Sequence, residues 1–132
     1  MNIKEVSEKY EIPADTLRYW ERIGAIPPVQ RSASGYRDYD DEDQQWVYWT
    51  NCMRKAGVSL ERIVEYIDLF KAGDQTIPTR KALLKEQLAV IKEHLAEIQK
   101  MYNALDEKIT HYEEHMVEYE GKLKIRKEET LK

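Results

Sequence analysis

The chain has 132 residues, a net charge of −4 and a charged fraction of 35%, a composition typical of a helix-rich soluble protein. No apolar run approaches the ~20 residues that a membrane-spanning helix needs, and the N-terminus, with Lys4 and Glu5, is too charged for a signal peptide. We therefore expect a cytoplasmic protein without membrane contact, and the single cysteine excludes an internal disulfide.

The first predicted helix covers residues 2–9, where apolar side chains recur at helical spacing. The pair Ile12-Pro13 then disfavours helix, because a proline restricts the residue before it to extended conformations. A second helix follows, so the two form a helix-turn-helix, whose second helix normally enters the DNA major groove. Many small helical proteins contain such a hairpin, so the spacing alone leaves DNA binding open.

The second predicted helix begins at Asp15, whose carboxylate can accept a hydrogen bond from a free backbone N–H, and stops at Gly24. Its apolar residues at helical spacing would face a core: Leu17, Trp20 and Ile23. Its other faces carry the candidate DNA contacts Thr16, Arg18, Tyr19 and Arg22. Arginine and aromatic side chains suit phosphates and base edges, so the sequence predicts that this helix contacts DNA.

A two-stranded wing is predicted after this helix. The sequence Ser-Ala-Ser-Gly at residues 32–35 has turn composition, and short alternating runs flank it at residues 29–31 and 36–39. These runs supply a second set of candidate DNA contacts: Arg31, Tyr36, Arg37 and Tyr39. The helix and the wing are thus predicted to be two DNA-contacting elements of one domain.

These two stretches closely resemble the winged helix-turn-helix of the MerR family of bacterial transcription regulators. The resemblance rests on Leu-Arg-Tyr-Trp-Glu-Arg-Ile-Gly at residues 17–24 and on Ser-Gly-Tyr-Arg-Asp-Tyr at residues 34–39. Family members more often have Tyr at the position of Trp20, a change that keeps the aromatic core residue but removes a hydroxyl. The resemblance implies a dimer on a pseudo-palindrome in double-stranded promoter DNA, which it untwists and bends so that RNA polymerase can use the promoter.

The net charge of −4 is unlike that of most nucleic-acid-binding proteins. The charges are segregated, however. Four acidic residues follow the wing at positions 40–43, whereas the arginines at positions 18, 22, 31 and 37 lie in the second helix and the wing. The acidic run therefore lies outside the predicted DNA-contacting elements, and the motif is the stronger evidence for DNA binding.

Two further helices are predicted behind the helix-turn-helix. Asp40 would cap the third, which ends near Ala56 before Gly57, and Ser59 would cap the fourth, which ends at Gly73. Their predicted buried stripes are Trp46, Trp49, Met53 and Ala56 on the third helix, and Leu60, Ile63, Ile67 and Phe70 on the fourth. We expect this DNA-binding domain to span residues 1–74.

A long dimerisation helix is predicted over residues 75–120, followed by a basic tail at residues 121–132. Its apolar residues alternate steps of four and three for more than five heptads, as in a coiled coil: Leu84, Leu88, Ile91, Leu95, Ile98, Tyr102, Leu105, Ile109, Tyr112, Met116, Tyr119 and Leu123. Packing back onto the small domain would cover only the first turns, so a second copy must cover the rest. The sequence predicts a mainly α fold with a homodimer through this helix, and the family resemblance implies that the coiled coil is antiparallel.

The single cysteine, Cys52, lies at the edge of the third helix's apolar stripe. A buried, inert thiol is the commonest state of a free cysteine, whereas nearby Arg54 and Lys55 would favour a reactive thiolate if they point toward it. The segments at residues 51–59 and 65–70 resemble the MerR branch that responds to reactive aldehydes and to carbonyl or nitrosative stress, whose members carry one cysteine at this place. That resemblance implies a sensing role for Cys52.

Other functions have weaker support in the sequence. His111 and His115 share a helical face, but no third metal ligand is evident. A cysteine enzyme would need a histidine near Cys52, and all the histidines, including His94, lie on the dimerisation helix. No cofactor motif such as a Gly-rich phosphate loop occurs, so we expect no enzyme, no metal and no cofactor. The alternatives to a thiol sensor are a regulator that binds a small molecule at the ends of the dimer helices, and an architectural DNA-bending protein.

Overall fold

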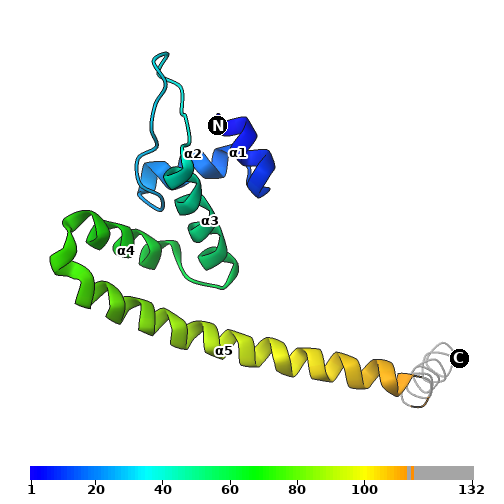
Figure 1. Ribbon diagram of the computed structural model, residues 1–132. Helices are drawn as coiled ribbons and strands as arrows, with labels where there is room; N and C mark the ends of the chain where they lie inside the picture. The colour runs from blue at the N-terminus through cyan, green and yellow to red at the C-terminus, as the bar shows by residue number, and fades with distance from the viewer. Residues whose placement is uncertain (113, 115–132) are drawn as a thin grey trace, which may run out of the picture. The chain divides into compact units, whose positions relative to one another are not determined.

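The computed structural model describes residues 1–112 and 114, and it confirms the mainly helical fold (Figure 1). In chain order the elements are α1 (Ile3–Tyr10), α2 (Ala14–Ile23), α3 (Asp41–Lys55), α4 (Leu60–Ala72), the 3₁₀ turn η1 (Asp74–Thr76) and α5 (Ile77–Thr110). The chain divides into two compact units, Met1–Lys92 and Glu93–Lys132. None of the helices in the described part of the chain is both long and apolar enough to cross a bilayer.

The helix-turn-helix forms from α1 and α2. Asn2 caps α1 by accepting a hydrogen bond from the Glu5 N–H at 2.9 Å, and the Glu5 carboxylate accepts one from the Asn2 N–H in return. The predicted cap at Asp15 is wrong: α2 begins at Ala14, since the Pro13 carbonyl already accepts hydrogen bonds from the N–H groups of residues 16 and 17. The predicted stop is confirmed, because Gly24 adopts a left-handed conformation with φ of 85°.

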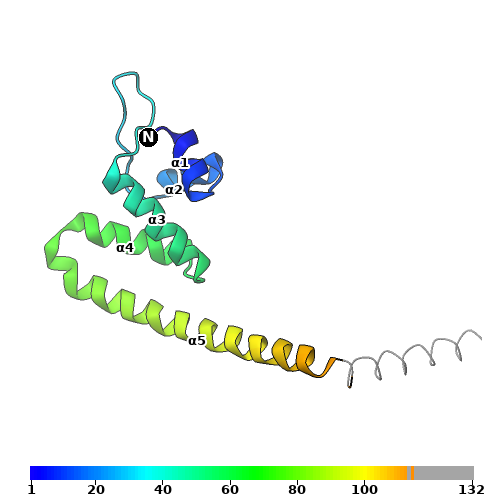
Figure 2. The same ribbon diagram turned by 45° about the vertical axis from the view of Figure 1, so that its right-hand side comes forward.

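The wing (residues 29–39) is a hairpin with a single antiparallel bridge, between Arg31 and Arg37, instead of two continuous strands. The Ser32 N–H donates to the Tyr36 carbonyl at 2.8 Å, and Gly35 takes the positive φ that the turn requires. Figures 1 and 2 show the segment as a cyan loop that extends away from the helices α1 and α2.

The predicted caps of α3 and α4 are confirmed. The Asp40 side chain accepts a hydrogen bond from the Asp43 N–H at 2.7 Å, and the Ser59 hydroxyl accepts one from the Arg62 N–H at 3.3 Å. Burial of α3 differs from the predicted stripe. Its buried residues are Gln44, Val47 and Thr50, whereas Trp46, Trp49, Met53 and Ala56 are half-buried. The reason is that α3 packs on two sides, and the tryptophans occupy the side toward α4.

A single hydrophobic core joins the helices and the base of the wing. Leu17 and Trp20 of α2 lie in it with Ile63 and Ile67 of α4, as the sequence predicted for each stripe. Tyr39, a predicted DNA contact, is fully buried in this core. Its backbone N–H donates to the Met1 carbonyl at 2.7 Å, which draws the end of the wing into the domain. The side chain of Tyr39 is therefore not among the exposed candidate DNA contacts.

Replacing Tyr39 with phenylalanine is expected to stabilise the protein by about 1 kcal/mol, because a buried hydroxyl without a partner costs desolvation energy. The Tyr39 hydroxyl has no hydrogen-bond partner in the described part of the chain. Burial also raises the pKa of Tyr39 above its ordinary value of 10.0, against the opposing charge of Arg37. The folded state therefore holds this proton more tightly than the unfolded chain. The free energy of unfolding consequently falls as the pH rises above 10.0 and through the raised pKa of Tyr39.

Urea unfolding of wild type and Tyr39→Phe, at neutral pH and above pH 10, measures both effects. The variant should be more stable at neutral pH and should lose less stability in alkali. A variant that is less stable at neutral pH would show that the hydroxyl has a partner in solution.

The compact unit extends beyond residue 74, where the sequence predicted the domain to end, because the first turns of α5 belong to it. Leu83 and Gln87 are buried, and Ile91 packs against the core. Arg62 of α4 also pairs with Glu86 of α5 at 3.3 Å. The beginning of α4 is thus joined to α5 by an ion pair, and Ile91 of α5 packs against the core that contains Ile63 and Ile67.

The predicted heptad seam is solvent-exposed along most of its described length. Leu88, Leu95, Ile98, Tyr102, Leu105 and Ile109 are each between 59% and 66% exposed, and every described residue from 93 to 112 is exposed. Ile91 differs, because it packs on the core. Met116, Tyr119, Leu123 and the predicted basic tail lie outside the described residues. An apolar stripe of this length is left uncovered within one chain.

Candidate nucleic-acid interface and thiol environment

The outer face of α2 carries the polar and aromatic residues that the sequence predicted for it. Arg18, Tyr19 and Arg22 are exposed, and Thr16 is half-buried. Arg18 pairs with Asp15 at 2.9 Å, and the Arg22 guanidinium lies 5.2 Å from the centroid of the Tyr19 ring. Both contacts are at the surface, where ion pairs contribute little and exchange readily with another anion.

Glu21 of α2 connects this helix to the wing. Its carboxylate accepts a hydrogen bond from Arg37 Nε at 2.6 Å and one from the Val29 N–H at 3.1 Å. Arg31 Nη2 lies 3.8 Å from the same carboxylate. The Glu21 side chain is only 12% exposed, so water screens this arrangement less than a surface ion pair. Glu21 therefore positions both wing arginines beside α2, a role that sequence reasoning missed.

The remaining candidate DNA contacts of the wing differ in how exposed their side chains are. Tyr36 is 76% exposed at the hairpin and Arg31 is exposed, whereas Arg37 is half-buried. The Glu21 contact engages Arg37 through Nε, and the terminal nitrogens of Arg37 make no hydrogen bond within the described residues. Glu21 thus joins Arg31 and Arg37 of the wing to α2, while Tyr39 lies in the core.

Cys52 is half-buried on α3 and forms no disulfide. The Cys52 side chain, one helical turn from Tyr48 on α3, raises the pKa of the exposed Tyr48 hydroxyl. Tyr48 also lines a pocket of about 390 Å³ with Lys9 and Gln44, among other residues. Arg54 instead donates to the Val58 carbonyl at 2.9 Å. The sequence analysis considered Arg54 and Lys55 near the thiol but not Tyr48, which precedes Cys52 by four residues on the same helix.

The histidines do not assemble a metal centre in the part of the chain that is described. No group of three or more His, Cys, Asp or Glu side chains there could hold an ion. His111 Nδ1 lies 3.4 Å from a Glu114 oxygen, and His94 also has a partner. His115 lies outside the described residues.

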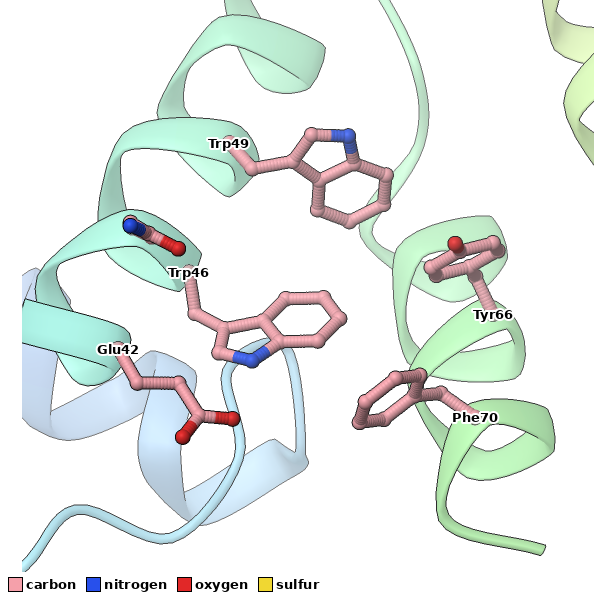
Figure 3. A pocket seen from close by; sticks show the side chains of 6 residues that line it. Glu42, Trp46, Trp49, Tyr66 and Phe70 are labelled. Carbon is pink, nitrogen blue, oxygen red and sulfur yellow. The ribbon is translucent and has the colours of Figure 1, made fainter. Parts of the chain in front are cut away.

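A second pocket, of about 410 Å³, opens between α3 and α4 (Figure 3). We call it the aromatic pocket, and its lining residues are Glu42, Gln45, Trp46, Trp49, Tyr66 and Phe70. The sequence assigned three of these aromatic residues to buried stripes. Periodicity does reveal which of them share a helix face, but it does not reveal that the rings of α3 and α4 pack on one another and line one open pocket.

Comparisons with known proteins agree with this geometry. The family model described as MerR HTH family regulatory protein matches residues 1–69, and a second model, described as MerR, DNA binding, matches residues 49–108. The HTH-type transcriptional regulator AdhR of Bacillus subtilis is 49% identical over 66% of this chain and 62% of its own length. The chain therefore spans less than two thirds of that relative.

Two solved structures are similar over nearly all the chain. One is a putative MerR family transcriptional regulator from Listeria monocytogenes, 42% identical with a TM-score of 0.80 over 98% of both chains. The other is HiNmlR, described as a MerR family regulator lacking the sensor domain and bound to promoter DNA. It is 30% identical, with a TM-score of 0.78, over 88% of this chain and 92% of its own. The chain therefore belongs to the MerR family of helix-turn-helix transcription regulators, which are DNA-binding proteins and not enzymes.

Proposed function

We propose that this regulator binds promoter DNA as a homodimer in the cytoplasm and responds to reactive aldehydes, or to related oxidative and nitrosative stress, through Cys52. The observation that carries the DNA-binding part is that Glu21 holds the wing arginines Arg31 and Arg37 against α2, the helix whose exposed residues include Arg18 and Arg22. A basic surface made of a helix and an adjacent hairpin can contact a groove and the flanking backbone together.

The proposed DNA contacts divide between the two elements. Arg18 and Tyr19, with Thr16 and Arg22, would enter the major groove or contact its edges from α2. Tyr36, Arg31 and Arg37 would contact the backbone or the adjacent minor groove from the wing. HiNmlR, the related regulator described as bound to promoter DNA, supports DNA binding by this fold. A phosphate would replace Asp15 as the partner of Arg18, and would bind the terminal nitrogens of Arg37 while its Nε stays on Glu21, since guanidinium groups bind phosphate oxygens well.

Dimerisation would occur through the heptad seam from Leu84 to Leu123. The exposed apolar stripe supports it, because a lone helix cannot bury such a stripe itself. Two rigid domains joined in this way could change their mutual angle, and the DNA contacts would compensate for bending and untwisting of the promoter. RNA polymerase would then use the remodelled promoter. The long seam favours this regulator over a purely architectural DNA-bending protein.

The proposed inducer would react with the thiol of Cys52. A small aldehyde can reach a half-buried thiol on α3, and the thiolate sulfur would add to the carbonyl carbon. The new S–C bond forms as the carbonyl π pair moves to oxygen and takes a proton, which gives a hemithioacetal. Met53 and Trp49 beside Cys52 pack against the core, so an adduct would strain closely packed side chains and shift the orientation of the domain.

Arg37→Ala tests the DNA-binding proposal. We expect this variant to weaken binding to specific and unrelated DNA alike, and to reduce the slope of log affinity against log salt by about one unit, because one phosphate contact is lost. Binding is measured by fluorescence anisotropy across a salt series. Lys71→Ala, an exposed cation at the end of α4, is the control and should leave the slope unchanged.

A loss confined to one base position would instead identify Arg37 as a base-reading residue. Unchanged affinity and slope for Arg37→Ala, and also for Arg18→Ala, would contradict the assignment of this surface to DNA.

A further inference from the structure

The corner between α4 and α5, drawn in green in Figure 1, is closed by side chains from η1 and from the start of α5. The last carbonyl groups of an α-helix have no partner within the helix, so other groups must satisfy them. The Thr76 hydroxyl lies 2.6 Å from the Leu69 carbonyl oxygen and 2.7 Å from that of Gly73, and it donates to this pair. The Gln75 amide donates to the Ala72 carbonyl at 2.5 Å. The residues that lead into α5 therefore cap the end of α4.

Arg80 of α5 completes this cap one helical turn after Thr76. Its Nε donates to the Thr76 hydroxyl oxygen at 3.0 Å, and its Nη2 donates to the Gly73 carbonyl at 3.4 Å. The guanidinium also lies 5.4 Å from the centroid of the Phe70 ring on α4. A cation beside the C-terminus of a helix is stabilised by the helix dipole. We call Thr76 and Arg80 the corner clamp, since their side chains bridge the end of α4 and the start of α5.

The corner clamp lies on the face of α5 that packs on its own domain. Steps of three and four residues keep side chains on one face of a helix. Such steps lead from Arg80 to Leu83 and Gln87, which are both buried. Leu84 and Leu88 of the heptad seam follow one position later and are exposed. Because the two faces are adjacent on one helix, contacts that hold the first face to the domain also set the direction of the seam.

We propose that Arg80 is a positioning residue for operator recognition. Together with Thr76 it fixes the start of α5 against α4, and so sets the separation at which the two DNA-binding domains of a dimer contact their half-sites. This inference rests on the proposed dimer on promoter DNA. The half-site spacing that a dimer accepts follows from its geometry, and a rigid connection reduces the free energy lost in ordering the domains on DNA. A loose corner would accept several spacings and bind the preferred one less tightly.

The first test compares the full-length protein with Arg80→Ala and Thr76→Val. The DNA is an operator that wild type selects from random sequences, and versions with one base pair added or removed between the half-sites. We expect wild type to prefer the selected spacing at least about tenfold, and each variant to prefer it about threefold or less. Lys81→Ala removes an exposed neighbouring cation, leaves the corner clamp intact and should keep the wild-type preference.

The spacing preference separates positioning from a loss of stability. A variant that is merely less stable would bind every spacing more weakly and would keep the wild-type preference. A preference that is unchanged in both Arg80→Ala and Thr76→Val would therefore overturn the proposal.

Amide hydrogen exchange without DNA tests the corner clamp by itself. Exchange in residues 70–80 should be at least about threefold faster in Arg80→Ala than in wild type, because local opening of the corner costs less. Lys81→Ala should exchange as wild type does. Equal exchange in Arg80→Ala and wild type would overturn the corner clamp. A wild type that selects no operator would instead overturn the proposed function, and the positioning role with it, while the exchange difference would remain.

Discussion

Replacing Leu95 and Leu105 together with aspartate is expected to convert the protein to monomers and to lower its affinity for a palindromic operator at least about hundredfold. Each leucine that the dimer buries contributes about 1.5–3 kcal/mol, and in one chain these two are 65% and 59% exposed. Two substitutions in each of two chains therefore remove most of the interface energy, and they also place charges within it. A monomer would then bind only one half-site.

Sedimentation equilibrium and a gel-shift titration measure the two effects. The first unit should remain folded, because Leu95 and Leu105 lie beyond Lys92. The matched control replaces Ala96 and Lys100 with aspartate, since these residues lie off the heptad seam on the same helix. A dimer that persists in the leucine variant would show that the seam is not the interface. Monomers that bind the operator with wild-type affinity would show that dimerisation is unnecessary for recognition.

Cys52→Ser is expected to abolish the transcriptional response to a small aldehyde and to leave operator binding within about twofold of wild type. Serine has nearly the shape of cysteine, and surface or half-buried changes of this size usually alter stability little. Its hydroxyl is a far weaker nucleophile than a thiolate at neutral pH, so no stable adduct forms. In vitro transcription with and without formaldehyde gives the response, and intact mass gives the adduct.

Met53→Leu is the matched control for this experiment. It removes the neighbouring sulfur atom, conserves side-chain volume and should retain the response. Induction that survives in Cys52→Ser would overturn thiol sensing while leaving the regulator itself intact. An adduct on wild-type Cys52 that leaves the footprint of the operator unchanged would separate the thiol chemistry from the DNA distortion that we propose it controls.

Local signals determined most of the helical framework. Asp40 and Ser59 have side-chain oxygens that satisfy free N–H groups at a helix start, and Gly24 tolerates the left-handed conformation at a helix end. These are interactions within a few residues, so a sequence reader can find them. The same logic failed at Asp15, because the Pro13 carbonyl had already begun the helical hydrogen bonds. Two adjacent signals competed there, and the one nearer the N-terminus determined where the helix begins.

Periodicity in the sequence identified which residues share one face of a helix or strand, but not which elements pack against that face. The apolar stripe of α5 was predictable, since a heptad repeat is a property of one helix. Which part of α5 packs within the chain was not predictable, because the burial of Leu83 and Gln87 and the packing of Ile91 on the core depend on neighbouring elements. Alternation along the wing likewise grouped Tyr39 with Arg37, which is half-buried. The hydrogen bond from Tyr39 to Met1, thirty-eight residues away in sequence, draws it into the core.

The sequence by itself determined the family, the helix-turn-helix with its wing and the candidate contacts on α2, because these depend on residue types at short spacing. Only the tertiary structure decided that Glu21 positions Arg31 and Arg37, and that the rings of α3 and α4 pack on one another and line one pocket. Such contacts depend on how far apart two packed elements lie and on the side chains that fill the space between them. No spacing along one segment specifies that distance.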